Sequence, residues 1–205
     1  MRALLLVDIQ NDFMPFGSLP VPHGDEVVAV ANALMDSVDF VVATQDWHPQ
    51  THGSFASNHY GRAQGDIVTL GGVSQVLWPD HCVQGLPGAS FHAALNVARI
   101  DAVVRKGTDP LIDSYSGFFD NGHRQDTGLT DLLRSRGVTE LVVVGLATDY
   151  CVKYTALDGE TEGFDVVVIE DGVRAVDLSA GDGEKALAEM REAGCRVEHL
   201  RDLLG

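Results

Sequence analysis

The chain has few basic residues. Its 205 residues include 14 Lys and Arg against 30 Asp and Glu, which gives a formal net charge of −16. With so few cations, no basic surface is left for a polyanion, so we expect neither nucleic acid nor an anionic membrane as a partner. The acidic residues are scattered instead of forming a tail, which is typical of a solvated surface.

Cysteines and long apolar runs are also scarce. The three cysteines, Cys82, Cys151 and Cys195, are too few and too far apart for a disulfide framework or a CxxC metal knuckle. Reduced thiols are therefore expected. No apolar run reaches the length of a membrane span, and no basic segment precedes an apolar core as in a signal peptide. We expect a cytoplasmic protein.

The chain does contain a regular alternation of two patterns. Apolar residues recur at helical spacing in 24–38, 127–137 and 180–194. Short runs rich in β-branched residues predict strands at 3–9, 40–44, 102–105, 141–145, 166–169 and 196–200. Strands that alternate with helices favour parallel pairing. The prediction is one domain over residues 1–205, an α/β fold in which a six-stranded, mostly parallel, doubly wound sheet forms the middle of a three-layer α/β/α sandwich.

One segment interrupts this alternation. An insertion at about 45–98, rich in Gly, His, Pro and Trp, separates the second expected strand from the third. A loop of this length inside a compact domain is usually functional. We therefore expect the insertion to carry part of a metal or substrate site.

Ligands of an open α/β sheet bind beyond the carboxyl ends of its strands. At these ends the sequence places an Asp, an Asp with a His, a Lys and a Cys: Asp8, Asp46 with His48, Lys106 and Cys151. Asp8 and Lys106 each follow an apolar run. Besides a catalytic role, a capping carboxylate and a side chain that reaches out to water are the alternatives for them.

Cys151 lies at an expected strand-to-helix turn. With Thr148 or Asp149 as the helix N-cap, the sulfur would occupy the first helical turn, where free N–H groups favour a thiolate. The alternative is a small buried hydrophobic residue, and this alternative suits Cys195 better.

A thiol nucleophile needs a base and a cation beside it. Asp8 and Lys106 are the nearest candidates of the right type. The backbone N–H groups of Ala147 and Cys151 would then form the oxyanion site.

A second group of residues is typical of metal ligands. Asp46 and His48 are two positions apart, so they share one face of an extended segment, and His81 could complete a set of one carboxylate and two imidazoles. Such a set suits a divalent ion, with zinc first and iron or manganese as alternatives. The competing histidines are His52, His59 and His92. A hydrogen-bonded surface loop is the alternative to a metal site.

Five ordered motifs then carry a resemblance to a known family. They are "LLLVDIQNDF", "QDWHPQTHGSF", "WPDHCVQGLPGA", "KGTDPLIDSYSGFFDN" and "VVGLATDYCVKYTA". Together they resemble the nicotinamidase and pyrazinamidase family of the isochorismatase-like cysteine hydrolases, over almost the whole chain. The resemblance implies the isochorismatase-like hydrolase fold, and a triad of Cys151 as nucleophile, Asp8 as general base and Lys106 as the stabilising cation.

The resemblance also implies the rest of the site. It assigns Asp46, His48 and His81 to the metal, with His52 as a second-layer residue or as part of the pocket lining. It places the substrate ring against Phe13 and Trp78, with Tyr115 in the pocket wall. It implies a cis peptide bond before Ala147 and a structural role for Cys82. The chain departs from the pattern at His23, where relatives tend to have glycine.

The activity that the resemblance implies is hydrolysis of nicotinamide, and of pyrazinamide, to the acid and ammonia, within NAD salvage. A related cysteine amidase or carbamoyl hydrolase with another small amide as substrate is the first alternative. A metal-bound hydroxide that attacks directly and a non-catalytic metal or thiol module are the others. The sequence leaves a homo-oligomer open.

Overall fold

The structure is a computed structural model that describes residues 1–204. Its centre is a six-stranded sheet in the order β5-β2-β1-β6-β7-β8. The strands are β1 (Arg2–Val7), β2 (Phe40–Asp46), β5 (Ala102–Lys106), β6 (Glu140–Leu146), β7 (Asp165–Arg174) and β8 (Arg196–Glu198). Each neighbouring pair is parallel. The predicted doubly wound α/β fold is confirmed, and the strand order reverses between β1 and β6.

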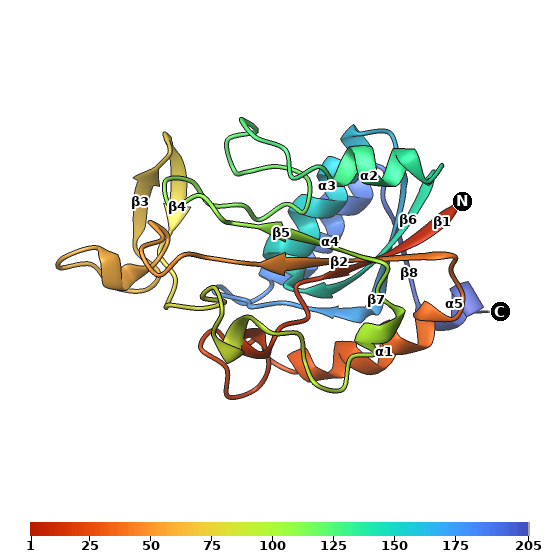
Figure 1. Cartoon of the computed structure of the whole chain (residues 1–205), viewed down its shortest axis with the longest axis horizontal. Coiled ribbons are helices and arrows are strands. Elements are labelled where there is room, and N and C mark those ends of the chain that lie inside the picture. Colours follow the sequence, from red (N-terminus) through yellow and green to blue (C-terminus); the bar gives the residue numbers. More distant parts are fainter. Residues whose placement is uncertain (205) are drawn as a thin grey trace.

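Helices cover both faces of the sheet (Figure 1). On one face lie α1 (Val27–Met35) and α5 (Leu200–Leu204), and on the other α2 (Leu129–Ser135), α3 (Lys153–Thr161) and α4 (Asp182–Glu192). Successive residues of β1 alternate between the two cores: Leu4 and Leu6 pack in one, and Leu5 and Val7 in the other. A strand buried on both faces must be apolar throughout, which explains the unbroken run in β1.

The prediction for the last strand is partly wrong. Residues 196–200 were expected to be extended, but β8 ends at Glu198 and Leu200 begins α5. The Asp202 carboxylate accepts a hydrogen bond from the His199 N–H at 3.2 Å. The Asp171 carboxylate accepts one from the Leu200 N–H at 2.7 Å. These side-chain acceptors satisfy the first N–H groups of a helix, so the chain turns instead of extending the sheet.

The insertion contains an antiparallel hairpin that the sequence reading did not predict. Strands β3 (Ile67–Leu70) and β4 (Val73–Val76) are joined by Gly71 and Gly72, which have φ of 57° and 81°. A two-residue Gly-Gly loop with positive φ is a favoured hairpin turn, so this dipeptide was the missed signal. Figure 1 shows the hairpin beyond the end of the sheet toward which the β2 arrow points.

Within residues 1–204, no helix has both the length and the apolar character that crossing a membrane requires. The cysteines that the sequence contains are all free and buried.

Candidate active site

The predicted triad residues meet at the carboxyl edge of the sheet. Asp8 follows β1, Lys106 ends β5, and Cys151 lies in a π-helical turn, Thr148–Val152, that follows β6. Strands β1 and β6 are the neighbours between which the strand order reverses. The cluster therefore lies at the switch point, where open α/β sheets bind their ligands.

Lys106 is the centre of the cluster. Its Nζ lies 2.8 Å from Asp8 Oδ2 and 2.6 Å from Asp46 Oδ1, and it donates to the Ser114 carbonyl at 2.9 Å and to Cys151 Sγ at 3.3 Å. Burial disfavours the ammonium, but the two carboxylates outweigh burial and hold the pKa of Lys106 well above its ordinary value. The Lys106 side chain therefore stays a cation inside the site. The alternative, in which it reaches out to water, is wrong.

Asp8 is fully buried and has a φ of 48°, an uncommon conformation for a residue with a side chain. The Thr44 hydroxyl donates to its Oδ1 at 2.6 Å. Burial raises the pKa of Asp8 above its ordinary value, and the attraction of Lys106 only partly offsets this effect. Apart from the Lys106 ammonium at 2.8 Å, no donor in residues 1–204 contacts Asp8 Oδ2, so this oxygen can accept a proton.

The surroundings of Cys151 act against the thiolate that the free N–H groups of a helix start would favour. Burial, with the negative charges of Asp8 and Asp46, raises the pKa of the thiol well above its ordinary value, although Lys106 acts in the opposite direction. Carboxylate oxygens of both aspartates lie within 4.8 Å of the sulfur. In this setting the thiol keeps its proton until a base removes it.

The turn before the helix also differs from the expected cap. Its N-cap is Ala147, with no side-chain hydrogen bond, instead of Thr148 or Asp149. The Asp149 carboxylate instead accepts the N–H groups of Val176 and Asp177, at 3.0 and 2.9 Å, beyond the end of β7. The Leu146–Ala147 peptide bond is cis, as the resemblance implied.

Asp46, His48 and His81 come together beside the triad. The Nε2 atoms of His48 and His81 lie 3.4 and 3.7 Å from Asp46 Oδ2. Each Nδ1 atom is 2.8 Å from a backbone carbonyl, that of Gly107 for His48 and that of Pro79 for His81. A carbonyl only accepts, so each Nδ1 carries a proton, and each Nε2 is the ring nitrogen that faces Asp46 and is available to a metal ion. The group therefore fits a divalent metal ion.

His52 lies next to this group, and with His48 and Asp113 it forms a second set of possible ligands whose atoms lie within 4.8 Å of one another. Its ring is 4.3 Å from the His48 ring between centroids, and burial with the His48 charge lowers the pKa of His52 to about 4. Its Nδ1 contacts Ser54, and no partner for its Nε2 exists in the described chain. The choice of His81 over His52 as ligand stays a prediction.

The residues predicted for the substrate pocket line one cavity. Phe13, Trp78 and Tyr115 share its wall with Ala147 and Cys151. The sequence reading missed four further lining residues, Leu19, Asp113, Tyr150 and Val176. For Tyr150, the signal was its position directly before the cysteine. Its ring packs edge-on against Trp78 and Tyr115, with centroids 4.9 and 5.3 Å apart.

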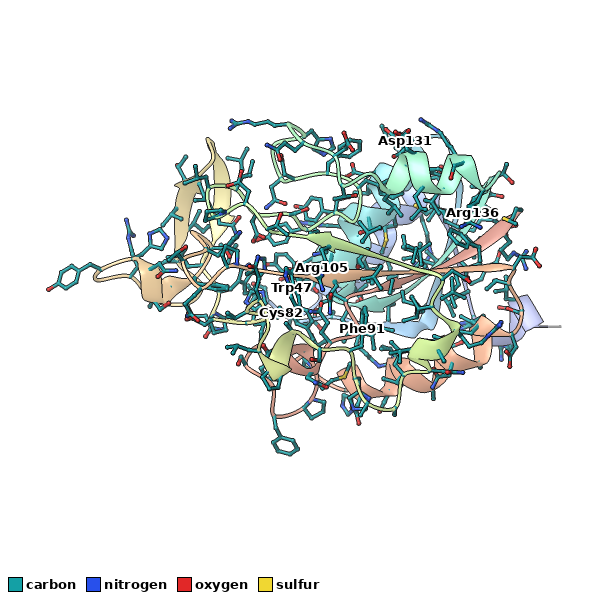
Figure 2. All side chains as sticks on the ribbon, in the orientation of Figure 1. Trp47, Cys82, Phe91, Arg105, Asp131 and Arg136 are labelled. Carbon is teal, nitrogen blue, oxygen red and sulfur yellow. The ribbon has the colours of Figure 1, made fainter. Side chains whose placement is uncertain are left out.

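Two further predictions concern residues outside the triad. His23 is exposed, with a left-handed φ of 57°, a conformation that glycine adopts without strain. The glycine that the resemblance implies for relatives would suit this conformation. Cys82 (labelled in Figure 2) is fully buried, and burial raises its pKa well above the ordinary value, which suits a structural thiol.

A thiol that shares a lysine with two carboxylates, beside a set of metal ligands at the switch point of a parallel sheet, is the arrangement of an α/β cysteine hydrolase. That class agrees with a comparison of the sequence with known families. The model of the isochorismatase domain matches residues 2–202, and the chain belongs to this family.

The most similar proteins include nicotinamidases. The chain is 52% identical to the nicotinamidase of Escherichia coli, over 98% of this chain and 96% of that protein. The structure of a nicotinamidase and pyrazinamidase from Acinetobacter baumannii has a TM-score of 0.95 and 44% identity, covering 98% and 97% of the two chains. A Pyrococcus horikoshii pyrazinamidase in complex with zinc has a TM-score of 0.78 and 37% identity, covering 97% and 98%.

Proposed function

We propose that the protein hydrolyses nicotinamide to nicotinate and ammonia, accepts pyrazinamide as well, and works through a thioester on Cys151. The observation that carries this proposal is the contact of Lys106 with Asp8, Asp46 and Cys151, because it places a thiol, a base and a cation within one buried cluster. The nicotinamidases among the relatives support the choice of substrate.

The first half of the reaction forms the thioester. Asp8 removes the proton of the Cys151 thiol, and the sulfur attacks the carboxamide carbon. Lys106 stabilises the negative charges on both groups, and the N–H groups of Ala147 and Cys151 hold the oxyanion. When the C–N bond breaks, Asp8 returns the proton to the leaving nitrogen, and ammonia departs.

The second half releases the acid. Asp8, ionised again, removes a proton from water, whose oxygen attacks the thioester carbon. The C–S bond breaks, and the proton passes from Asp8 to the sulfur, which restores the thiol and yields nicotinic acid, whose carboxyl proton goes to the solvent to leave nicotinate. The raised pKa of the thiol favours this return, because a sulfur that binds its proton tightly does not remain a thiolate.

Asp46, His48 and His81 would hold a divalent metal ion, and zinc is the proposed identity because the Pyrococcus relative is a zinc complex. When bound, the ion supplies a Lewis acid that the ring nitrogen of the substrate can approach. Phe13, Trp78 and Tyr115 bind the faces of the ring. These contacts orient the carboxamide toward the sulfur and exclude water.

The setting of the reaction is part of the proposal. Nicotinate is a precursor for pyridine nucleotides, so we place the enzyme in NAD salvage and in the cytoplasm, as a single domain. The nicotinamidases among the relatives support the reaction on which this placement depends.

The decisive experiment measures ammonia release from nicotinamide. The zinc-loaded wild type should release ammonia, and Cys151→Ala should lose at least about 10³-fold in kcat/KM, because the nucleophile is gone. Mass spectrometry of acid-quenched enzyme should find the nicotinoyl adduct on the peptide that contains Cys151. Near-normal turnover by Cys151→Ala would instead favour direct attack by a metal-bound hydroxide. Inactivity of the wild type would direct the search to other small amides.

A further inference from the structure

The hairpin in the insertion carries one buried polar side chain. Gln75 of β4 is 1% exposed, whereas its neighbours in that strand are exposed or only partly buried. A buried carboxamide costs free energy unless its polar atoms have partners. Nothing in the proposed chemistry requires an amide in the hairpin, so its partners indicate what it does.

The partners of Gln75 reach into the substrate pocket. Its Nε2 lies 2.8 Å from the Val76 carbonyl, 3.0 Å from Asp113 Oδ2 and 2.9 Å from the Tyr115 hydroxyl. The carbonyl and the carboxylate only accept, so the atom that faces them must be the amide nitrogen. On its other side, the Asn121 amide donates to Gln75 Oε1 at 3.3 Å.

The Tyr115 hydroxyl joins two walls of the pocket. Besides the contact with Gln75, it accepts the indole N–H of Trp78 at 3.1 Å. Tyr115 and Trp78 both line the cavity that contains Cys151. One oxygen therefore connects the chain that follows the hairpin to the loop that follows β5.

We propose that Gln75 is a positioning residue for the substrate, whose buried carboxamide holds the Tyr115 hydroxyl and, through it, the indole of Trp78 against the substrate ring. This inference rests on the proposed function and extends the pocket to the hairpin. Asp113 and Asn121 fix the carboxamide in turn. Gln75 itself does not line the cavity, so it acts through the two aromatic side chains.

The loss of the carboxamide has a defined consequence. In Gln75→Met the side chain keeps its length but donates nothing, so Asp113 and Tyr115 lose a buried donor. The aromatic walls then bind the ring less well, while Asp8, Lys106 and Cys151 keep their contacts. We expect KM for nicotinamide to rise about tenfold, the equivalent of one buried hydrogen bond, with kcat within about twofold of the wild type.

A double-mutant cycle tests the route through the hydroxyl. Tyr115→Phe should raise KM to a similar extent, and Gln75→Met should add little in the Tyr115→Phe background, because the acceptor is already absent. Gln64→Met is the matched control, since Gln64 is exposed in the same insertion and should leave KM unchanged. If the two effects are additive, or if folded Gln75→Met has the wild-type KM, the proposal is wrong.

A spectroscopic readout needs no turnover. The sequence contains two tryptophans, so in a Trp47→Phe background the emission reports Trp78 alone. Trp47 lies outside the pocket, stacked under Arg105 at 3.9 Å (Figure 2). Gln75→Met should shift the Trp78 emission to the red and lower its anisotropy, and unchanged emission would contradict the proposal.

If the wild type fails to hydrolyse nicotinamide, this fluorescence readout still shows whether Gln75 holds the Trp78 indole in place. If Gln75→Met does not fold, the KM of Tyr115→Phe decides, and a wild-type value overturns the inference.

Discussion

Asp8 is subject to two opposing effects. Burial raises its pKa, whereas the Lys106 ammonium and the Thr44 hydroxyl favour the ionised form. A base in this balance binds a proton more readily than a free carboxylate, while its partners still stabilise the ionised form, which a residue that accepts and returns protons requires. The balance depends on individual contacts, so single substitutions can shift it in a known direction.

Thr44→Val tests the balance at Asp8. The substitution is close to isosteric and removes the hydroxyl that donates to Oδ1 at 2.6 Å. The ionised form loses a stabilising hydrogen bond, so the pKa of Asp8 rises further. We expect the acidic limb of the pH profile of kcat/KM to move up by about one pH unit. A limb that stays in place would show that another group controls it, and Thr127→Val, outside the cluster, serves as the control.

The raised pKa of Asp8 also makes the free energy of unfolding depend on pH. The folded state binds the Asp8 proton more tightly than the unfolded chain, whose carboxyl titrates near 3.8. The contribution of this group is therefore fully present below pH 3.8 and is lost as the pH rises through the folded pKa. Asp8→Asn should remove this loss. The free energy of unfolding of the variant, measured with urea, should therefore vary less with pH between 3.8 and the folded pKa of Asp8.

Gly107, directly after β5, connects the lysine of the triad to the metal ligands. Its carbonyl accepts the His48 Nδ1 proton, its φ is 62°, and a Cβ at this position would lie 2.7 Å from that Nδ1. Gly107→Ala should therefore displace the His48 ring and weaken zinc binding by about 10- to 100-fold in a chelator competition. Gly128→Ala is the matched control, because Gly128 has a φ of 83° with no atom within 4 Å of its Cβ. Equal zinc affinity in both variants would contradict this role of Gly107.

The elements that the sequence could predict are those that its apolar pattern determines. Buried strands such as β1 and helices with one apolar face, such as α4, produce a periodic signal that can be read locally. Hairpin β3–β4 has half-exposed strands of four residues each, so its pattern is weak. The end of β8 depends on acceptors from Asp171 and Asp202, which a strand pattern does not reveal.

In the site, too, some features could be predicted from the sequence and others could not. Their positions at the expected strand ends were enough to choose Asp8, Lys106 and Cys151 as candidates, and the structure brings them together. The charge state of the thiol was not predictable, because it depends on burial and on two carboxylates brought in by other strands. Gln75 gave no signal, since one glutamine in a weak strand resembles any surface residue.

For the whole molecule, metal binding should be coupled to unfolding. The three candidate ligands come from β2, from the segment just after it and from the far end of the insertion, so the unfolded chain holds no such site. Zinc at a hundredfold excess over its Kd should add about 2.7 kcal/mol, which raises Tm by roughly 5–10 °C. Calorimetry with and without chelator measures the shift, and a single transition is expected for one domain. His81→Ala should abolish the shift, whereas an unchanged Tm in the wild type would exclude zinc binding at this affinity.

The position of β1 in the sheet also constrains the order in which the protein can fold. Residues Arg2–Val7 pair with Glu140–Gly145 on one side, and Arg2 is 138 positions from Glu140. As the ribosome extends the chain, β1 and β2 can pair early, but the other edge of β1 stays open until β6 emerges. An open edge on a strand whose residues 3–7 are all apolar invites pairing between nascent chains. Lowering the translation rate between β2 and β6 should therefore increase aggregation during synthesis.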